Sequence, residues 1–360
     1  LMNKSIGIYQ ADVPQGLLGT ASTTYVSIAD PTATTTLGTN CGGIGLTTSS
    51  LPSGWSYHCA SSSTLSNIDG TGWIPINFSQ ISSRSPLSRL PTDPINTSST
   101  GSYYTYTMGG SWELTGAMES QKQADTETKD GGLDPARYET GSNLTLSPFV
   151  GGMVGYWSFE EGSGSTVPDQ SGMGNNGSWS GSGSHYAAGK VGGMAGQFSS
   201  ATTDYVEIPS AASLRPTSQV TVIGWFNPNA LDNGALVGRT GNSSPNEVLF
   251  LQLYQANSSL RWYINGTAEN YGAPVAGQWQ HFAAVYDGTA ATKAVYLNGT
   301  LTSQVSQSGA LNTSNSYPLR IGTYYYASPS NLFSGKIDDV RMYNRALTAA
   351  EISAIYSATK

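Results

Sequence analysis

The chain has 360 residues, a formal net charge of −7 and only 11% charged residues. Because 38% of its residues are hydrophobic and 10% aromatic, it can bury a core, which excludes an intrinsically disordered protein. Its 16 basic residues form no cluster and are outnumbered by 23 acidic ones, so nucleic acid is not an expected partner. No stretch approaches the roughly 20 apolar residues that span a bilayer, so we expect no membrane segment in the chain as given.

Residues 1–150 are predicted to form a small α+β domain. Apolar residues at a 4-3-4 spacing near the start predict one face of a helix that ends before Pro14 and Gly16. This face consists of Met2, Ile6, Tyr9 and Val13. Alternating residues on either side of Gly109 and Gly110 predict a β-hairpin over 103–107 and 111–117. The charged stretch after residue 120 is expected to be an exposed loop before the domain boundary.

The chain has two cysteines, Cys41 and Cys59, in one Gly/Ser/Thr-rich segment. We expect a disulfide there, which indicates an oxidising compartment. Two free buried thiols are the alternative. A metal pair is disfavoured, because the three histidines are scattered through the chain.

Residues 151–360 are predicted to form an antiparallel β-sandwich, because short β-type runs alternate with turn residues at fairly even intervals. The predicted strands are 156–159, 196–198, 205–208, 219–227, 235–239, 247–255, 260–265, 279–286, 293–297, 319–323 and 334–343. Near the end, Thr348 followed by Glu351 forms a capping box that predicts one short helix. The fold class is therefore mainly β.

Three ordered segments make the C-terminal half similar to the LamG-like, concanavalin A-like jelly-roll family. They are GYWSFEEGSGSTVPDQSGMGNNG, then GQWQHFAAVYDG with AVYLNGTL, and finally FSGKIDDVRMYNRALTAAEI. This resemblance implies a jelly-roll sandwich over about residues 151–360. It does not by itself assign a function.

The N-terminal half resembles the globular head of a type IV pilin-like or type II secretion pseudopilin subunit. The similar segments are CASSSTLSNIDGTGWIPINF, LPTDPINTSSTGSYYTYT and SWELTGAMES. The resemblance implies a long apolar helix leading into a small sheet, of which residues 1–13 are expected to be the last turns. The rest of that helix is expected to have been removed or to be supplied by a separate chain. Other filament subunits are the implied partners.

A calcium site is the first candidate site. The loop from Asp169 to Gly177 is rich in carboxylates, amides and glycines, the ligands and the flexibility that calcium favours. Strict alternation in KIDDVRMY places Asp338 on the inward face with Val340 and Met342, where a carboxylate needs a partner. The LamG resemblance implies that the ligands are Asp169, Asn175 and Asp338. The alternative is that these side chains only satisfy turn and loop backbone groups.

A carbohydrate-binding platform is the second candidate site. Tyr324, Tyr325 and Tyr326 stand in a predicted loop, where aromatic rings can stack on sugar faces. Trp262 and Tyr271 are more remote candidates for the same role. The aromatic residues of the alternating strands, such as Trp225 and Phe282, are expected to be core.

No catalytic residues are predicted. Glycoside hydrolysis needs two carboxyl groups at a set separation, and no predicted strand carries inward acids at alternate positions. Serine-elbow and zinc-helix motifs are also absent from the sequence. The prediction is an extracellular or cell-surface, filament-associated subunit that displays a module binding polysaccharide or a surface protein. The alternatives are a structural filament subunit that the sandwich only decorates, and a non-catalytic glycan-binding module of a secreted enzyme system.

Overall fold

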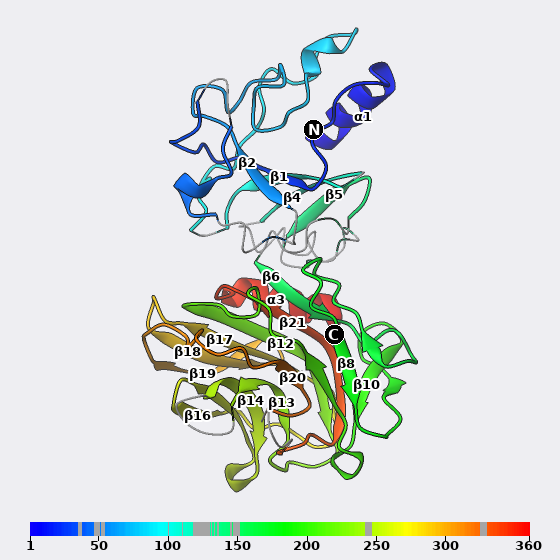
Figure 1. The fold of residues 1–360 in the computed structure, drawn as a ribbon, viewed down its shortest axis with the longest axis vertical. Helices are drawn as coiled ribbons and strands as arrows, with labels where there is room; N and C mark the ends of the chain where they lie inside the picture. The colour runs from blue at the N-terminus through cyan, green and yellow to red at the C-terminus, as the bar shows by residue number, and fades with distance from the viewer. Residues whose placement is uncertain are drawn as a thin grey trace. The chain divides into compact units, whose positions relative to one another are not determined.

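The structure is a computed structural model, and its contacts divide the chain into two compact units, Leu1–Gly151 and Gly152–Lys360. Among the described residues, β-strands outnumber α-helices in both units (Figure 1). The residues that the structure describes are 1–34, 38–46, 51, 55–99, 101–109, 111–117, 130, 132, 134, 137–144, 146, 152–241, 247–324 and 330–360.

The N-terminal unit is a small α+β arrangement with one sheet, in the order β2-β1-β3-β4-β5. β1 and β2 are parallel, and the other neighbours are antiparallel. The predicted hairpin is confirmed as β3 and β4, with Tyr106 opposite Leu114. The bounds are α1 Met2–Asp12, β1 Thr23–Val26, η1 Gly42–Ile44, β2 Ser56–Cys59, η3 Phe78–Gln80, β3 Tyr104–Met108, β4 Trp112–Gly116 and β5 Tyr138–Gly141.

Helix α1 contributes to the core of this unit through the predicted face. Ile6 and Tyr9 are buried in a cluster with Trp73 and Phe78, and Met2 and Val13 pack against its edge. The Tyr9 ring meets Phe78 edge-on, with ring centroids 6.0 Å apart. A helical period of 3.6 residues brings these side chains to one side of the helix, so the short helix is stabilised by packing more than by its own propensity.

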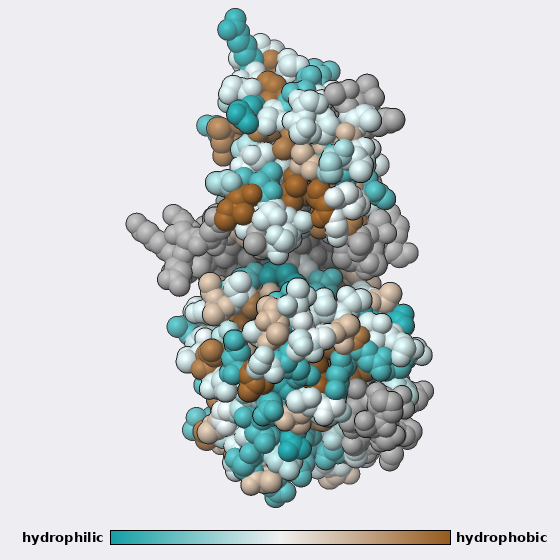
Figure 2. Space-filling model, turned by 90° about the vertical axis from the view of Figure 1, so that its left-hand side faces the viewer, coloured by the Kyte–Doolittle hydropathy of each residue, from teal (hydrophilic) through white to brown (hydrophobic). Residues whose placement is uncertain are grey.

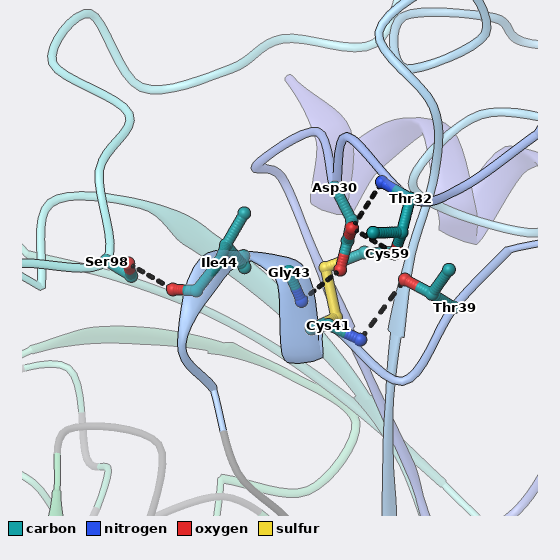
Figure 3. The surroundings of a disulfide bond; sticks show 8 residues. All are labelled: Asp30, Thr32, Thr39, Cys41, Gly43, Ile44, Cys59 and Ser98. Carbon is teal, nitrogen blue, oxygen red and sulfur yellow. Dashed lines mark hydrogen bonds between the residues drawn. A yellow bond between two sulfur atoms is a disulfide. The ribbon is translucent and has the colours of Figure 1, made fainter.

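The predicted disulfide between Cys41 and Cys59 is confirmed, with Cα atoms 5.3 Å apart and both residues fully buried (Figure 3). It joins η1 to the end of β2 in a region with little regular structure. Asp30 reinforces the loop by accepting hydrogen bonds from the backbone of Thr32 and Gly43, at 2.8 and 3.0 Å. In the chain-entropy model, a bridge across 18 residues stabilises the fold by about 3 kcal/mol.

The C-terminal unit is a sandwich of two sheets. One, sheet D, has the order β19-β18-β17-β12-β21-β10-β9, with β6 also paired to β21; the other, sheet E, has the order β16-β15-β14-β13-β20-β11-β8-β7. The bounds in sheet D are β6 Met153–Trp157, β9 Tyr186–Ala188, β10 Met194–Phe198, β12 Gln219–Pro228, β17 Gln280–Asp287, β18 Thr292–Leu297, β19 Thr300–Ser306 and β21 Gly335–Tyr343. Those in sheet E are β7 Thr166–Val167, β8 Gly177–Ser180, β11 Tyr205–Ile208, β13 Ala235–Thr240, β14 Glu247–Tyr254, β15 Ser259–Ile264, β16 Thr267–Tyr271 and β20 Leu319–Ile321. Short 3₁₀ turns lie at η5 Ser200–Thr202 and η6 Gln255–Asn257.

The predicted sandwich and its main strands are confirmed, but β7, β8, β9, β16 and β19 were not predicted. All five lie at or near a sheet edge. β19 illustrates the reason, because its seven residues TLTSQVS are exposed or only half buried. An edge strand without a buried face lacks the apolar alternation by which a strand is recognised in sequence.

The core lies between the inner faces of the two sheets. Trp157, Phe226 and Trp262 are fully buried there. The indole Nε1 of Trp262 also donates across the core to the carbonyl of Val285, at 3.3 Å. Trp262 and Tyr271 therefore belong to this core, and their suggested role as remote sugar-binding residues is wrong.

Helix α3, Ala349–Thr359, covers the outer face of sheet D (Figure 1). The predicted capping box is confirmed, with Thr348 and Glu351 bonded reciprocally. Trp225 of β12 points away from the core and donates its Nε1 to the Thr359 hydroxyl, at 2.9 Å. The ring of Tyr356 lies 5.8 Å from that of Trp225. The helix thus covers the part of this outer face around Trp225.

A β-bulge in β21 reverses the predicted orientation of Asp338. Asp339 has a left-handed φ of 53°, and the register against β12 shifts at this point. Ile337 therefore faces the core, and Asp338 lies opposite Trp225 on the outer face. The prediction that Asp338 shares the inward face of Val340 and Met342 is wrong, because one extra residue in a strand inverts the alternation on its far side.

The pH dependence of stability is expected to include His281, which is buried beside Trp225 and Tyr356. Burial, helped by the positive charge of Arg341, lowers the pKa of His281 to about 3. In the unfolded chain His281 binds a proton below about pH 6.5, whereas in the folded protein it stays neutral until about pH 3. The free energy of unfolding is therefore highest above about pH 6.5 and falls between pH 6.5 and 3, by up to about 1.4 kcal/mol per pH unit. Urea unfolding at pH 7 and pH 4.5 should give a smaller loss for His281→Phe than for the wild type. Equal losses would contradict this assignment.

Candidate functional site

The loop that follows β7 is organised around Asp169. Its Oδ1 accepts from the backbone N–H groups of Tyr156 and Ser171, both at 2.9 Å. Its Oδ2 accepts from the backbone N–H of Asn175, at 2.8 Å. The Asn175 amide donates to the carbonyl of Val154 at 2.7 Å, so both side chains hold the loop against β6. These contacts agree with the alternative, in which Asp169 and Asn175 bond only to backbone groups of turns and loops.

Asp338 contacts a different loop. Its Oδ2 accepts from the backbone N–H groups of Lys190 and Val191, at 2.7 and 2.9 Å. Burial raises the pKa of Asp338 to about 7, although these two hydrogen bonds lower it. Within the described ranges, no contact joins Asp338 to Asp169 or Asn175, and no three His, Cys, Asp or Glu side chains group so as to hold a metal ion. The calcium site remains a prediction.

Of the three predicted platform tyrosines, the structure describes only Tyr324; Tyr325 and Tyr326 lie outside the described residues. Tyr324 is only 6% exposed. Its ring stacks on Phe250 with centroids 4.2 Å apart, and its hydroxyl accepts from the Asn331 amide at 2.6 Å. Tyr324 is thus part of an ordered aromatic cluster instead of standing free in a loop.

This cluster lies on the outer face of sheet E. Phe250 also stacks on Tyr263, with centroids 4.5 Å apart and rings nearly parallel. Gly238 is the cross-strand partner of Phe250, and a Cβ there would lie 2.3 Å from the Cβ of Tyr324. The absence of a side chain at Gly238 therefore makes room for Tyr324. We call Phe250, Tyr263 and Tyr324 the aromatic stack.

Charged side chains flank the aromatic stack. Along the same cross-strand row, Gly238 is followed by Arg320 and then Glu207. Arg320 bonds Glu207 through Nε at 3.0 Å and lies over the ring of Tyr205, 4.8 Å from its centroid. On the opposite side, the guanidinium of Arg261 lies 3.3 Å from the ring centroid of Tyr254.

The outer face of sheet E therefore combines flat rings with charged and amide groups. Tyr205, Glu207, Tyr254 and Arg261 are partly exposed. Such a surface can stack on the apolar face of a sugar and bond its hydroxyls. The alternation in EVLFLQLY and SLRWYI could have indicated this face, because every second side chain of each run points away from the core. The view in Figure 2 shows a surface of the C-terminal unit that is mostly hydrophilic or neutral, with scattered hydrophobic groups.

Residues 200–353 match the family model described as the concanavalin A-like lectin/glucanases superfamily. Domain 4 of AbnA, a GH43 extracellular arabinanase from Geobacillus stearothermophilus solved with arabinotriose, is 21% identical; the match covers 58% of this chain and 98% of that one, with a TM-score of 0.45. The binding domain of Paraclostridial Mosquitocidal Protein 1 is 16% identical, with 57% and 52% covered and a TM-score of 0.44. The comparison with curated proteins returns no match.

These findings support a concanavalin A-like jelly roll in the C-terminal unit. No family model matches the N-terminal unit, and the prediction that it is pilin-like rests on the sequence resemblance alone. Among the residues that the structure describes, no helix is both long and apolar enough to cross a membrane.

Replacing Gly238 by Ala should disrupt the aromatic stack. The new Cβ would collide with the Tyr324 Cβ at 2.3 Å and press on the Phe250 Cβ at 3.0 Å. Overpacking of this kind costs about 1–3 kcal/mol. We expect a lower melting temperature and a changed near-UV circular dichroism spectrum. Gly7→Ala is the control, because a Cβ at this helical position meets nothing within 4 Å. A G238A protein with the stability and spectrum of the wild type would contradict the close packing.

Proposed function

We propose that the protein is an extracellular surface subunit whose C-terminal sandwich binds polysaccharide through the outer face of sheet E. One observation carries this proposal: α3 packs on the outer face of sheet D, whereas the outer face of sheet E carries the partly exposed Tyr254 and Arg261 beside the aromatic stack, whose own rings are buried. The stacked rings are themselves buried, so they keep this part of the sheet rigid, and the partly exposed Tyr254 beside them would lose little conformational entropy on binding.

The proposed role is binding and not catalysis. Glu207, the acidic member of the cross-strand row, is paired with Arg320 at 3.0 Å. A carboxylate engaged in this way is suited to hold its neighbour in position, and glycoside hydrolysis would need a second acid at a set separation across the sugar. Attachment to a glycan needs only the surface described above.

An extracellular location is supported by the buried disulfide of the N-terminal unit, because such bonds persist in oxidising surroundings. We further propose that this unit is a pilin-like head. The packing of α1 onto a small, mostly antiparallel sheet supports that proposal. The partners would then be other filament subunits or a separate helix-bearing chain, and the sandwich would be displayed on the filament.

The glycan proposal can be tested by binding of the full chain to a polysaccharide array, followed by affinity measurement on the best ligand. The double variant Tyr254→Ala/Arg261→Ala should weaken binding about tenfold or more, because a stacking contact contributes about 0.5–1.5 kcal/mol and a cation–π pair a similar amount. Tyr186→Ala, at a partly exposed tyrosine of sheet D, is the matched control and should bind like the wild type. Absence of any glycan ligand would favour the alternative of a structural subunit.

Calcium is proposed as a second ligand, at Asp169, Asn175 and Asp338. The oxygen-rich loop and the Oδ1 of Asp338, which has no hydrogen-bond partner among the described residues, support it. Adding calcium to the EDTA-treated full chain should release binding heat and raise the melting temperature, and Asp338→Asn should reduce both effects. Magnesium is the control ion. No heat and no melting shift with calcium would rule out this site.

A further inference from the structure

One arginine of the sandwich core is buried without an anionic partner among the residues that the structure describes. Arg239 of β13 is fully buried and pairs across the strand with Leu249, a core residue, so its side chain points inward. Its two terminal nitrogens donate to the side-chain oxygen of Asn315 at 3.3 Å and to the carbonyl of Asn312 at 3.0 Å. Both acceptors are neutral. The Nε has no hydrogen-bond partner in the described part of the chain.

A second guanidinium lies close to the first. Burial, together with the positive charge of Arg215, lowers the pKa of Arg239 to about 10. Arg215 is partly exposed, but its Nε is buried and has no partner among the described residues. The same holds for the amide nitrogen of Asn315 and the hydroxyl of Ser210. Several donors are thus left with unused hydrogen-bonding capacity.

The strand register brings these donors to one end of sheet E. β11 ends at Ile208, opposite Leu319 at the start of β20. Gly238 lies opposite Arg320, so β13 ends beside the start of β20. The residues after β11, those ending β13 and those preceding β20 therefore meet at the same end. We call Ser210, Arg215, Arg239 and Asn315 the arginine end.

Three other arginines of the same unit have carboxylate partners, whereas Arg261 stacks on Tyr254. Arg320, Arg341 and Arg345 each pair with a carboxylate. No carboxylate pairs with Arg215 or Arg239 within the ranges that the structure describes. A guanidinium keeps its proton under ordinary conditions, so it cannot escape the cost of burial by becoming neutral. A buried cation beside a second, partly exposed one is therefore unfavourable unless an anion accompanies them.

We infer that the arginine end binds the oxyanion group, carboxylate or sulfate, of an acidic polysaccharide. Guanidinium, amide and hydroxyl donors match the oxygens of such a group, and arginine can bond it through two parallel hydrogen bonds. The partly exposed Arg215 gives access from solvent, and Arg239 supplies a second charge behind it. This inference names the ligand class within the proposed polysaccharide binding and rests on that binding; it does not depend on the outer face of sheet E as the contact surface. A protein of net charge −7 would otherwise repel such polymers, so a local pair of cations is needed to hold them.

The test compares the full chain with charged and neutral forms of the same polymers. The probes are polygalacturonate and its methyl ester, dextran sulfate and dextran, and inorganic sulfate alone. We expect the wild type to bind at least one charged polymer ten times or more tighter than its neutral form, and sulfate to raise the melting temperature. Arg215→Gln should lose both effects. Arg89→Gln, an exposed arginine of the N-terminal unit with the same charge change, should retain them.

Equal affinity for the charged and neutral forms overturns the inference, as does a loss in Arg215→Gln no larger than in Arg89→Gln. Because Arg215 is partly exposed, its variant should fold; the melting curve without ligand checks this. Arg239→Lys is a second variant that keeps the charge but not the paired donors, and it should weaken binding of the charged polymer.

The two proposals fail in different ways. If Tyr254→Ala/Arg261→Ala loses glycan binding and Arg215→Gln does not, the surface of sheet E stands and the arginine end is overturned. If charge-dependent binding is lost only in Arg215→Gln, the arginine end is supported and the surface of sheet E is overturned.

Discussion

The packing of the two inner sheet faces is the constraint on which the rest of the C-terminal unit depends. Trp157, Phe226 and Trp262 fill this layer, and the bond from the Trp262 indole to the Val285 carbonyl joins the two sheets across it. Once one face of each strand is buried, alternation determines which side chains reach the outer faces. The aromatic stack on sheet E and Trp225 on sheet D are both consequences of this core.

The two outer faces then differ in what covers them. On sheet D, α3 covers Trp225 and His281, so these side chains contribute to packing and are not accessible to a ligand. On sheet E, aromatic rings alternate with charged residues across the strands. The arginine end belongs to the same sheet but to its inner side, where buried cations lack carboxylates among the described residues. If both proposals hold, the outer face of sheet E selects a ligand by its shape and the arginine end selects it by its charge.

Much of the fold could be predicted because its signals are local. The helix face at Ile6 and Tyr9, the hairpin around Gly109, the capping box at Thr348 and the long alternating strands each depend on neighbours within a few residues. The disulfide could be predicted because only Cys41 and Cys59 are available to pair. Polar edge strands such as β19 could not, since their stability comes from hydrogen bonds to a neighbouring strand and not from a buried face.

The candidate sites depended on contacts between distant residues. Asp338 was expected to face the core, but a bulge at Asp339 turned it outward, and bulges leave little trace in local sequence. Tyr324 was predicted to stand in a loop as part of a sugar-binding platform, and only the fold placed it over Gly238 and against Phe250. The sequence by itself therefore determined the β-sandwich, the disulfide and the caps, because these follow from periodicity and composition. Only the tertiary structure decided which rings stack and which arginines lack a counter-charge, because strand register joins residues that are far apart in the chain.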